Sequence, residues 1–122
     1  DALLFTARNA LSATGREPKT RLVDWRALPD DLGRFDLVFA ADVLYERSFA
    51  PLVAETFRRT LAPGGRGLLA DQGRVALGSF LEEATARGLR HRVVHQEARP
   101  LAPPSPEGSS TQQITVFELS HG

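Results

Sequence analysis

The sequence contains no cysteine and no methionine, and it has one lysine, Lys19, among 15 basic residues. Without cysteine the chain can form neither a disulfide nor a thiolate metal site. No apolar run is long enough for a membrane-spanning helix, and the first residues lack the pattern of a signal peptide. The formal net charge is zero, which gives no electrostatic reason to expect nucleic acid or an anionic membrane as a partner. We therefore expect a soluble, cytoplasmic protein that binds neither nucleic acid nor membrane.

The rest of the composition is that of a globular domain. The chain has 122 residues, of which 42% are hydrophobic, so it is one domain or part of one, with a real core. Its preference for arginine over lysine and its abundant alanine are typical of a GC-rich genome, and we expect a bacterial source. The sequence begins at Asp1 and leads directly into a helical pattern. We expect this start to be the cut edge of a larger domain.

Apolar residues recur at the spacing of one helix face over residues 2–14, 48–62 and 75–87, which predicts three helices. The clearest is 48–62, where Ser48 stands at the N-cap position and Pro63-Gly64-Gly65 ends the pattern.

Short apolar segments predict five strands, at residues 20–25, 35–41, 66–71, 91–97 and 112–119. The segment 35–41 is expected to be buried on both faces of a parallel sheet. Residues 98–111 are rich in Pro, Ser and Gly, which predicts a flexible loop between the last two strands. Because no helix separates those two strands, they should be antiparallel. The sequence thus predicts an α/β domain with a mostly parallel sheet, and residues 1–122 as one partial domain.

Ligands of an open α/β sheet bind beyond the carboxyl ends of its strands. The first predicted strand ends in Asp24-Trp25. Trp25 could give a flat face to an adenine ring, with Asp24 accepting a hydrogen bond from the exocyclic amine. Alternatively, Trp25 simply covers the edge of the sheet as packing.

The second predicted strand ends in Ala41-Asp42, and Tyr45 follows three residues later. Asp42 could hold an amine or orient a cofactor, while Tyr45 shapes a substrate channel. Alternatively, Asp42 caps the following helix and Tyr45 is half-buried against it. Asp71, at the end of the third strand, is interpreted as the start of a turn with Gly73.

Other kinds of site are not indicated. The three histidines have no metal-like companions, so no metal is expected. No serine stands in a Gly-x-Ser-x-Gly frame. The glycines at 64, 65 and 67 lie between a helix and a strand, which is the reverse of the order that a phosphate loop needs.

Several of these segments together are similar to one family. They are Asp-Ala-Leu at 1–3, Asp24-Trp25, the run from Phe35 to Glu46 with its Asp-x-x-Tyr at 42–45, and Leu-Ala-Pro-Gly-Gly-Arg at 61–66. The chain resembles the seven-strand lysine methyltransferases (methyltransferase family 16, which includes nicotinamide N-methyltransferase-like proteins). This family belongs to the class I S-adenosylmethionine (SAM)-dependent methyltransferases. The resemblance covers residues 1 to about 119 and is most specific at Trp25 and at 42–45.

The resemblance implies a Rossmann-like three-layer sandwich with strand order 3-2-1-4-5-7-6. Residues 20–25, 35–41 and 66–71 would be its third, fourth and fifth strands, and the last two segments its sixth and seventh. It also implies that Asp24 and Trp25 lie at the adenine of SAM and that Ala41 lies beside the cofactor. Asp42 and Tyr45 would face the methyl acceptor.

The front of the family pattern is missing. The first strand with its acidic residue and glycine-rich turn, and the acidic residue that binds the ribose, have no counterpart in this sequence. We expect upstream residues or another chain to supply the missing strands. The resemblance implies methyl transfer to an amine nitrogen, with a protein lysine as the expected acceptor. A small-molecule N-methyltransferase and a catalytically inactive binding or assembly module are the alternatives.

Overall fold

The computed structural model describes residues 13, 15, 16, 18–100 and 111–122. The predicted helix over 2–14 and most of the predicted loop over 98–111 lie outside this part. The described elements are, in order, η1 (Trp25–Ala27), β1 (Phe35–Ala41), α2 (Phe49–Thr60), β2 (Leu61–Asp71), α3 (Leu77–Ala86), β3 (Leu89–Pro100) and β4 (Thr111–His121). No helix among them is long and apolar enough to cross a membrane.

The four strands form one mixed sheet in the order β1-β2-β4-β3. β1 and β2 are parallel, whereas β4 runs antiparallel to both β2 and β3. This order matches the expected 4-5-7-6, and the antiparallel pairing of the last two strands is confirmed. The expectation of a mostly parallel sheet is not met in the described part, where one strand pair is parallel and two are antiparallel.

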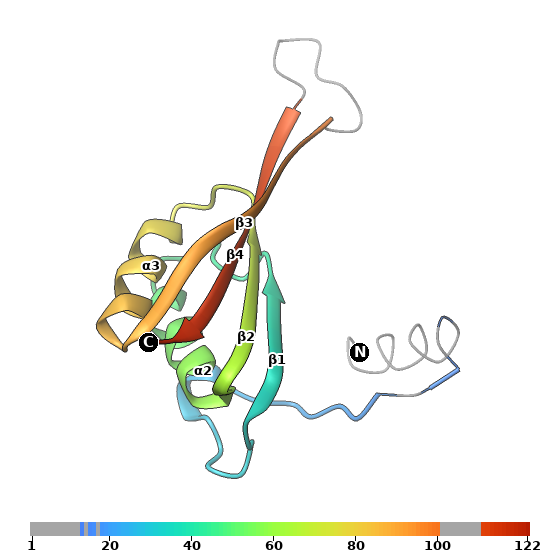
Figure 1. The fold of residues 1–122 in the computed structure, drawn as a ribbon, viewed down its shortest axis with the longest axis vertical. Coiled ribbons are helices and arrows are strands. Elements are labelled where there is room, and N and C mark those ends of the chain that lie inside the picture. The colour runs from blue at the N-terminus through green and yellow to red at the C-terminus, as the bar shows by residue number, and fades with distance from the viewer. Residues whose placement is uncertain (1–12, 14, 17, 101–110) are drawn as a thin grey trace.

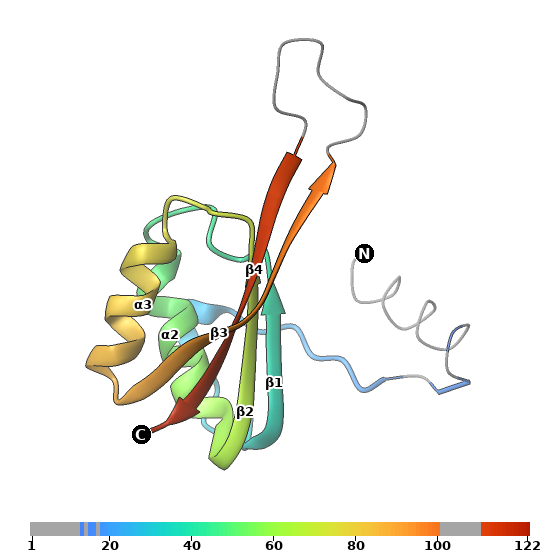
Figure 2. The ribbon, with the colours of Figure 1, turned by 45° about the horizontal axis from the view of Figure 1, so that its top comes forward.

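Both helices lie on the same face of the sheet (Figures 1 and 2). Their apolar sides bury a core against β2 and β4, whose largest members are Phe57, Phe80, Leu44, Leu61, Leu69 and Leu119. α2 approaches β2 closely at Gly67, where a Cβ atom would come within 3.1 Å of the Phe57 ring. Of the three predicted layers, the described residues therefore contain the sheet and one helical layer.

The predicted strand over 20–25 is wrong. Residues 18–24 run without a strand partner, and Trp25–Ala27 form a short 3-10 helix capped by the side chain of Asp24. The apolar side chain of Leu22 is 88% exposed. A strand needs a neighbour for its backbone hydrogen bonds, and no described strand pairs with this segment.

The remaining elements lie close to their predicted positions, with three differences. The residues Pro63-Gly64-Gly65 lie inside β2, at its irregular start. β3 continues through residues 98–100, which were predicted as loop. Ser48 stands at the N-cap of α2, but its hydroxyl bonds to Glu46 and not to a helix amide.

β1 is buried on one face only, which corrects the prediction that both its faces are covered. Val38 and Ala40 pack against the core below α2. On the other face, Phe35, Leu37 and Phe39 are 51%, 53% and 75% exposed. In the part of the chain that the structure describes, no strand pairs with the outer edge of β1.

Candidate functional site

The carboxyl ends of the two parallel strands lie side by side. Ala41, the last residue of β1, is in register with Ala70 of β2. The backbone N–H of Asp42 donates to the Ala70 carbonyl at 3.0 Å. Asp42 and Asp71 therefore occupy the edge of the sheet where ligands of open α/β sheets bind.

Asp42 has an unusual backbone and a side chain that accepts three hydrogen bonds. Its φ is 55°, and it is the one non-glycine residue with positive φ in the described ranges. Its Oδ1 accepts from Arg74 Nε at 2.9 Å and from Gln72 Nε2 at 3.0 Å, and its Oδ2 accepts from Arg74 Nη2 at 3.2 Å. The hydrogen bond from the Arg74 guanidinium holds the pKa of the Asp42 carboxyl below its ordinary value.

The alternative role of Asp42 as a helix cap is not what the structure shows. α2 begins at Phe49, seven residues after Asp42, with Ser48 in the N-cap position. The partners of the carboxylate come instead from the loop between β2 and α3. Through these hydrogen bonds, the Asp42 side chain links the end of β1 to the loop that follows β2.

The interpretation of Asp71 as the start of a turn is confirmed. Its side chain is buried, and Oδ2 accepts from the backbone N–H groups of Gly73 at 2.8 Å and of Arg74 at 2.9 Å. Its other oxygen, Oδ1, is buried without a hydrogen-bond partner. Next to it lies a small pocket of about 140 Å³, lined by Ala41, Asp42, Ala70, Asp71, Gln72 and Ile114.

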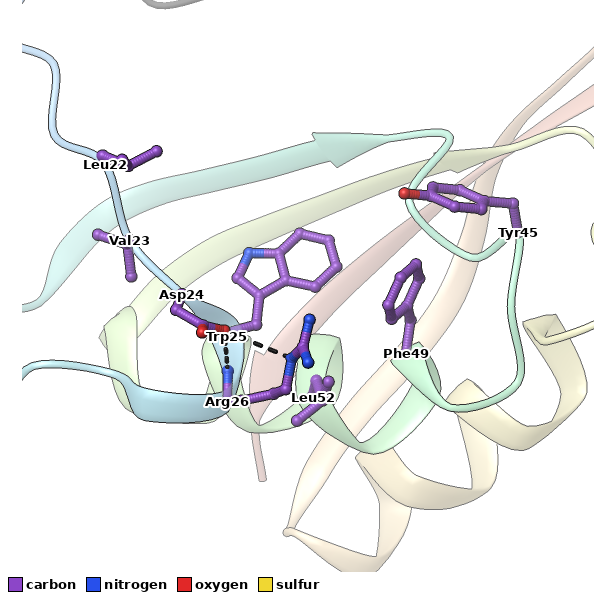
Figure 3. Close-up of a pocket in the computed structure, with 8 residues that line it drawn as sticks. All are labelled: Leu22, Val23, Asp24, Trp25, Arg26, Tyr45, Phe49 and Leu52. Carbon is purple, nitrogen blue, oxygen red and sulfur yellow. Dashed lines mark hydrogen bonds and ion pairs between the residues drawn. The ribbon is translucent and has the colours of Figure 1, made fainter.

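A second, larger pocket is built around Phe49, the first residue of α2. The Trp25 ring lies edge-on to Phe49, with centroids 5.6 Å apart, and the Tyr45 ring lies edge-on to it at 5.0 Å. Figure 3 shows the three rings together in the pocket wall. The pocket has a volume of about 440 Å³ and is lined by Leu22, Val23, Asp24, Trp25, Arg26, Tyr45, Phe49 and Leu52.

Asp24 and Trp25 both have structural roles in this wall. Oδ1 of Asp24 caps the 3-10 helix by accepting from the Arg26 N–H at 2.9 Å, and it lies 3.6 Å from Arg26 Nε. Trp25 is partly buried and packs against the core. Packing, one of the two alternatives for Trp25, is therefore what the structure shows, and the same side chain also lines a pocket.

The predicted site residues thus fall into two groups. Asp24, Trp25 and Tyr45 line the larger pocket, whereas Ala41 and Asp42 line the smaller one. The two pockets share no lining residue.

Three residues that the sequence did not single out are central to these groups. Phe49 was assigned only to the apolar stripe of its helix. Gln72 and Arg74 were not assigned, although the turn predicted at Asp71 and Gly73 is the feature that presents them. Across the described residues, no three His, Asp or Glu side chains gather in a way that could hold a metal ion.

The fold is similar to solved structures of methyltransferases. A "putative methyltransferase" from Thermoplasma acidophilum matches with a TM-score of 0.58 at 16% identity, over 98% of this chain and 53% of that one. Precorrin-6y C5,15-methyltransferase from Geobacter metallireducens matches with a TM-score of 0.53 at 16% identity, over 76% and 47%. A TehB-like SAM-dependent methyltransferase from Corynebacterium glutamicum matches with a TM-score of 0.50 at 19% identity, over 81% and 54%.

These similarities define the fold. The chain has an α/β fold that resembles part of the Rossmann-like domain of class I SAM-dependent methyltransferases. It spans about half the length of the solved structures that it matches. No protein-family model and no curated protein matches the sequence.

Proposed function

We propose that this chain is the C-terminal part of a cytoplasmic SAM-dependent methyltransferase of the seven-strand lysine methyltransferase type. In this proposal the enzyme transfers a methyl group to the side-chain amine of a protein lysine. The observation that carries it is the strand order β1-β2-β4-β3, with the smaller pocket at the carboxyl ends of β1 and β2 and the larger pocket beside the start of α2. The fold similarity to methyltransferases supports the reaction class, and the residues at 42–45 support the lysine type.

The larger pocket fits one end of SAM. The adenine would lie against Trp25, and the Asp24 carboxylate would accept a hydrogen bond from its exocyclic amine. An aromatic wall with one carboxylate suits a flat heterocycle, and the pocket volume of about 440 Å³ is in the range of small-molecule sites. When bound, SAM supplies a methyl group that is already activated for transfer to nitrogen. The described residues include no glycine-rich turn after a strand that would hold its other end.

The acceptor side is formed by Asp42 and Tyr45, with Ala41 next to the cofactor. Asp42 would accept a hydrogen bond from the amine, and Tyr45 would form a wall of the channel that leads to it. Since the hydrogen bond from Arg74 holds the pKa of the Asp42 carboxyl below its ordinary value, the carboxylate is a weak base. Its proposed role is therefore to orient the amine and not to take up its proton. Alignment of this kind lowers the barrier without a nucleophile in the protein.

The missing strands would be supplied at the outer edge of β1, by upstream residues or by another chain. The exposed row of Phe35, Leu37 and Phe39 supports this part of the proposal. An unpaired apolar strand edge is a ready template for a further strand.

The proposal is tested with the full-length protein and labelled SAM, offered to a cell lysate and to a metabolite pool. Label on a protein lysine is the expected result. Label on small molecules alone would contradict the lysine acceptor and support the small-molecule alternative. No transfer to any acceptor would contradict the enzyme assignment.

The role of Asp42 is tested by replacing it with alanine, which should reduce turnover by about 10- to 100-fold, as expected for loss of one hydrogen bond to a charged group. Asp42→Gly is the matched control, because glycine adopts the left-handed backbone of Asp42 without strain. If the carboxylate matters, both variants lose activity equally. If only the backbone matters, the glycine variant stays active, and that result would contradict the role.

An inactive binding or assembly module is the second candidate. It is favoured by one observation: Arg74 and Gln72 already occupy most of the Asp42 carboxylate. The upstream sequence discriminates the two. An acidic residue followed by Gly-x-Gly-x-Gly there supports the enzyme, and its true absence supports the module.

A further inference from the structure

The Asp42 carboxylate has one acceptor position left. An ionised carboxylate has about four lone-pair positions. Arg74 and Gln72 fill three of them, two on Oδ1 and one on Oδ2. A ligand N–H that reaches Asp42 can therefore bind at a single place, on Oδ2.

Arg74, whose guanidinium leaves this position on Oδ2 open, is itself held in place. Oδ2 of the buried Asp71 accepts the backbone N–H of Arg74, and also that of Gly73, which has a φ of 84°. This turn fixes the start of the Arg74 side chain relative to the end of β2. The two bonds from Arg74 to Asp42 then form a planar fork, which fixes direction as well as distance.

The hydrogen bonds from Arg74 and Gln72 also stabilise a backbone conformation of Asp42 that is unfavourable on its own. A residue with a side chain is less stable than glycine in the left-handed region. At Asp42 this conformation is held by the bond to the Ala70 carbonyl and by the contacts of the carboxylate with Arg74 and Gln72. Without Arg74, the backbone and the carboxylate of Asp42 could each adopt other conformations.

We propose that Arg74 is a positioning residue for the acceptor site: its two-point bond to Asp42 turns the carboxylate so that Oδ2 alone receives the incoming amine. This inference rests on the proposed methyl transfer. The charged group that acts on Asp42 is Arg74, and Arg74 in turn interacts with the charges of Asp42 and of the buried Asp71.

The first test needs no activity. Carbon-13 NMR of the side-chain carboxyl groups gives the pKa of Asp42 in the full-length protein. Arg74→Gln should raise that pKa toward its ordinary value, and Arg74→Lys, which keeps the charge without the fork, should raise it less. Arg92→Gln is the matched control, because it removes another arginine–carboxylate pair, that with Glu118, and should leave Asp42 unchanged. The proposal would be overturned if the Arg74→Lys and Arg74→Gln proteins remain folded and the pKa of Asp42 in both is the same as in the wild type.

The second test is a double-mutant cycle in the methyl-transfer assay. Arg74→Gln should lower turnover by about tenfold in the wild-type background. It should have no further effect in an Asp42→Asn background, because Arg74 acts through Asp42. Equal losses in both backgrounds would show a general structural effect and contradict the proposal. If the wild-type protein transfers no methyl group, the proposed function fails, and the titration alone decides whether Arg74 orients Asp42.

Discussion

The two edge strands of the sheet, β3 and β1, differ in their charge, in their proline content and in the size of the apolar side chains that they expose. β3, at one edge, is mostly exposed, breaks its register with β4 between Val93 and His95, and ends in Pro100. It carries four charged residues, Arg90, Arg92, Glu97 and Arg99. β1, at the other edge, has one charged residue, Asp36, and exposes a row of three large apolar side chains.

Charges, bulges and prolines are the devices with which natural proteins protect exposed strand edges from pairing. β3 has four charged residues and a terminal proline, whereas β1 has one charged residue and no proline, and each strand has one break in register with its neighbour. β3 is therefore built as a true edge of the sheet, whereas β1 has the composition of an interior strand. The difference supports the proposal that further strands complete the site on the side of β1.

The largest effect that we expect is a difference in SAM binding between the 122-residue chain and the full-length protein. The 122-residue chain alone should bind SAM at least about 100-fold more weakly than the full-length protein, because it lacks the contacts to the ribose and the methionine end. Isothermal titration of both proteins measures the difference. Micromolar or tighter binding by the short chain would show that nothing on the far side of β1 is needed.

A smaller effect is expected on self-association of the 122-residue chain. Phe39→Lys places a charge in the exposed row of β1 and should shift self-association to about tenfold higher concentration, since it removes one large apolar side chain from any contact made there. Val93→Lys, on the protected edge strand, is the matched control and should change little. Sedimentation velocity over a concentration series distinguishes them. Equal shifts in the two variants would mean that the two edges do not differ in this respect.

The smallest effect concerns the attachment of β3. Glu118 of β4 accepts from Arg66 Nε at 2.5 Å and from Arg92 Nη2 at 3.1 Å, and these bonds hold the pKa of its carboxyl below the ordinary value. Because the folded-state pKa is lowered, this contribution to stability is present at neutral pH and is lost as the pH falls through that pKa. Glu118→Gln should therefore lower the free energy of unfolding modestly at pH 7.

The difference between Glu118→Gln and the wild type should disappear well below the ordinary carboxyl pKa of 4.5. Urea unfolding of both proteins across this pH range measures it. A difference that stays constant with pH would contradict an ionic origin of the effect.

Much of this fold is predictable from the sequence, because its elements are local. The apolar stripe and the following Pro-Gly-Gly place α2 within two residues of its observed ends. The direct connection between the last two strands predicts their antiparallel pairing. The segment around Leu22 and Val23 has strand-like residues but forms no strand, since strand formation depends on a neighbour that local sequence does not contain.

The candidate site is predictable in part. Strand ends point to Trp25 and Asp42, because ligand sites of α/β sheets lie there. The contact between Arg74 and Asp42 spans 32 residues and depends on how two loops approach each other in space. The grouping of Trp25 and Tyr45 around Phe49 depends in the same way on the path of residues 20–25, which the sequence predicted as a strand.

Hydrogen–deuterium exchange of the β1 amides in the complete protein, in the form in which it is purified, tests the central claim most directly. Our account predicts that the amides on the outer edge of β1 are protected to the same degree as those of β2, because a further strand pairs with them. The outer edge of β3 provides the internal reference for an unpaired edge. Exchange at the outer edge of β1 as fast as at that reference edge would contradict the account.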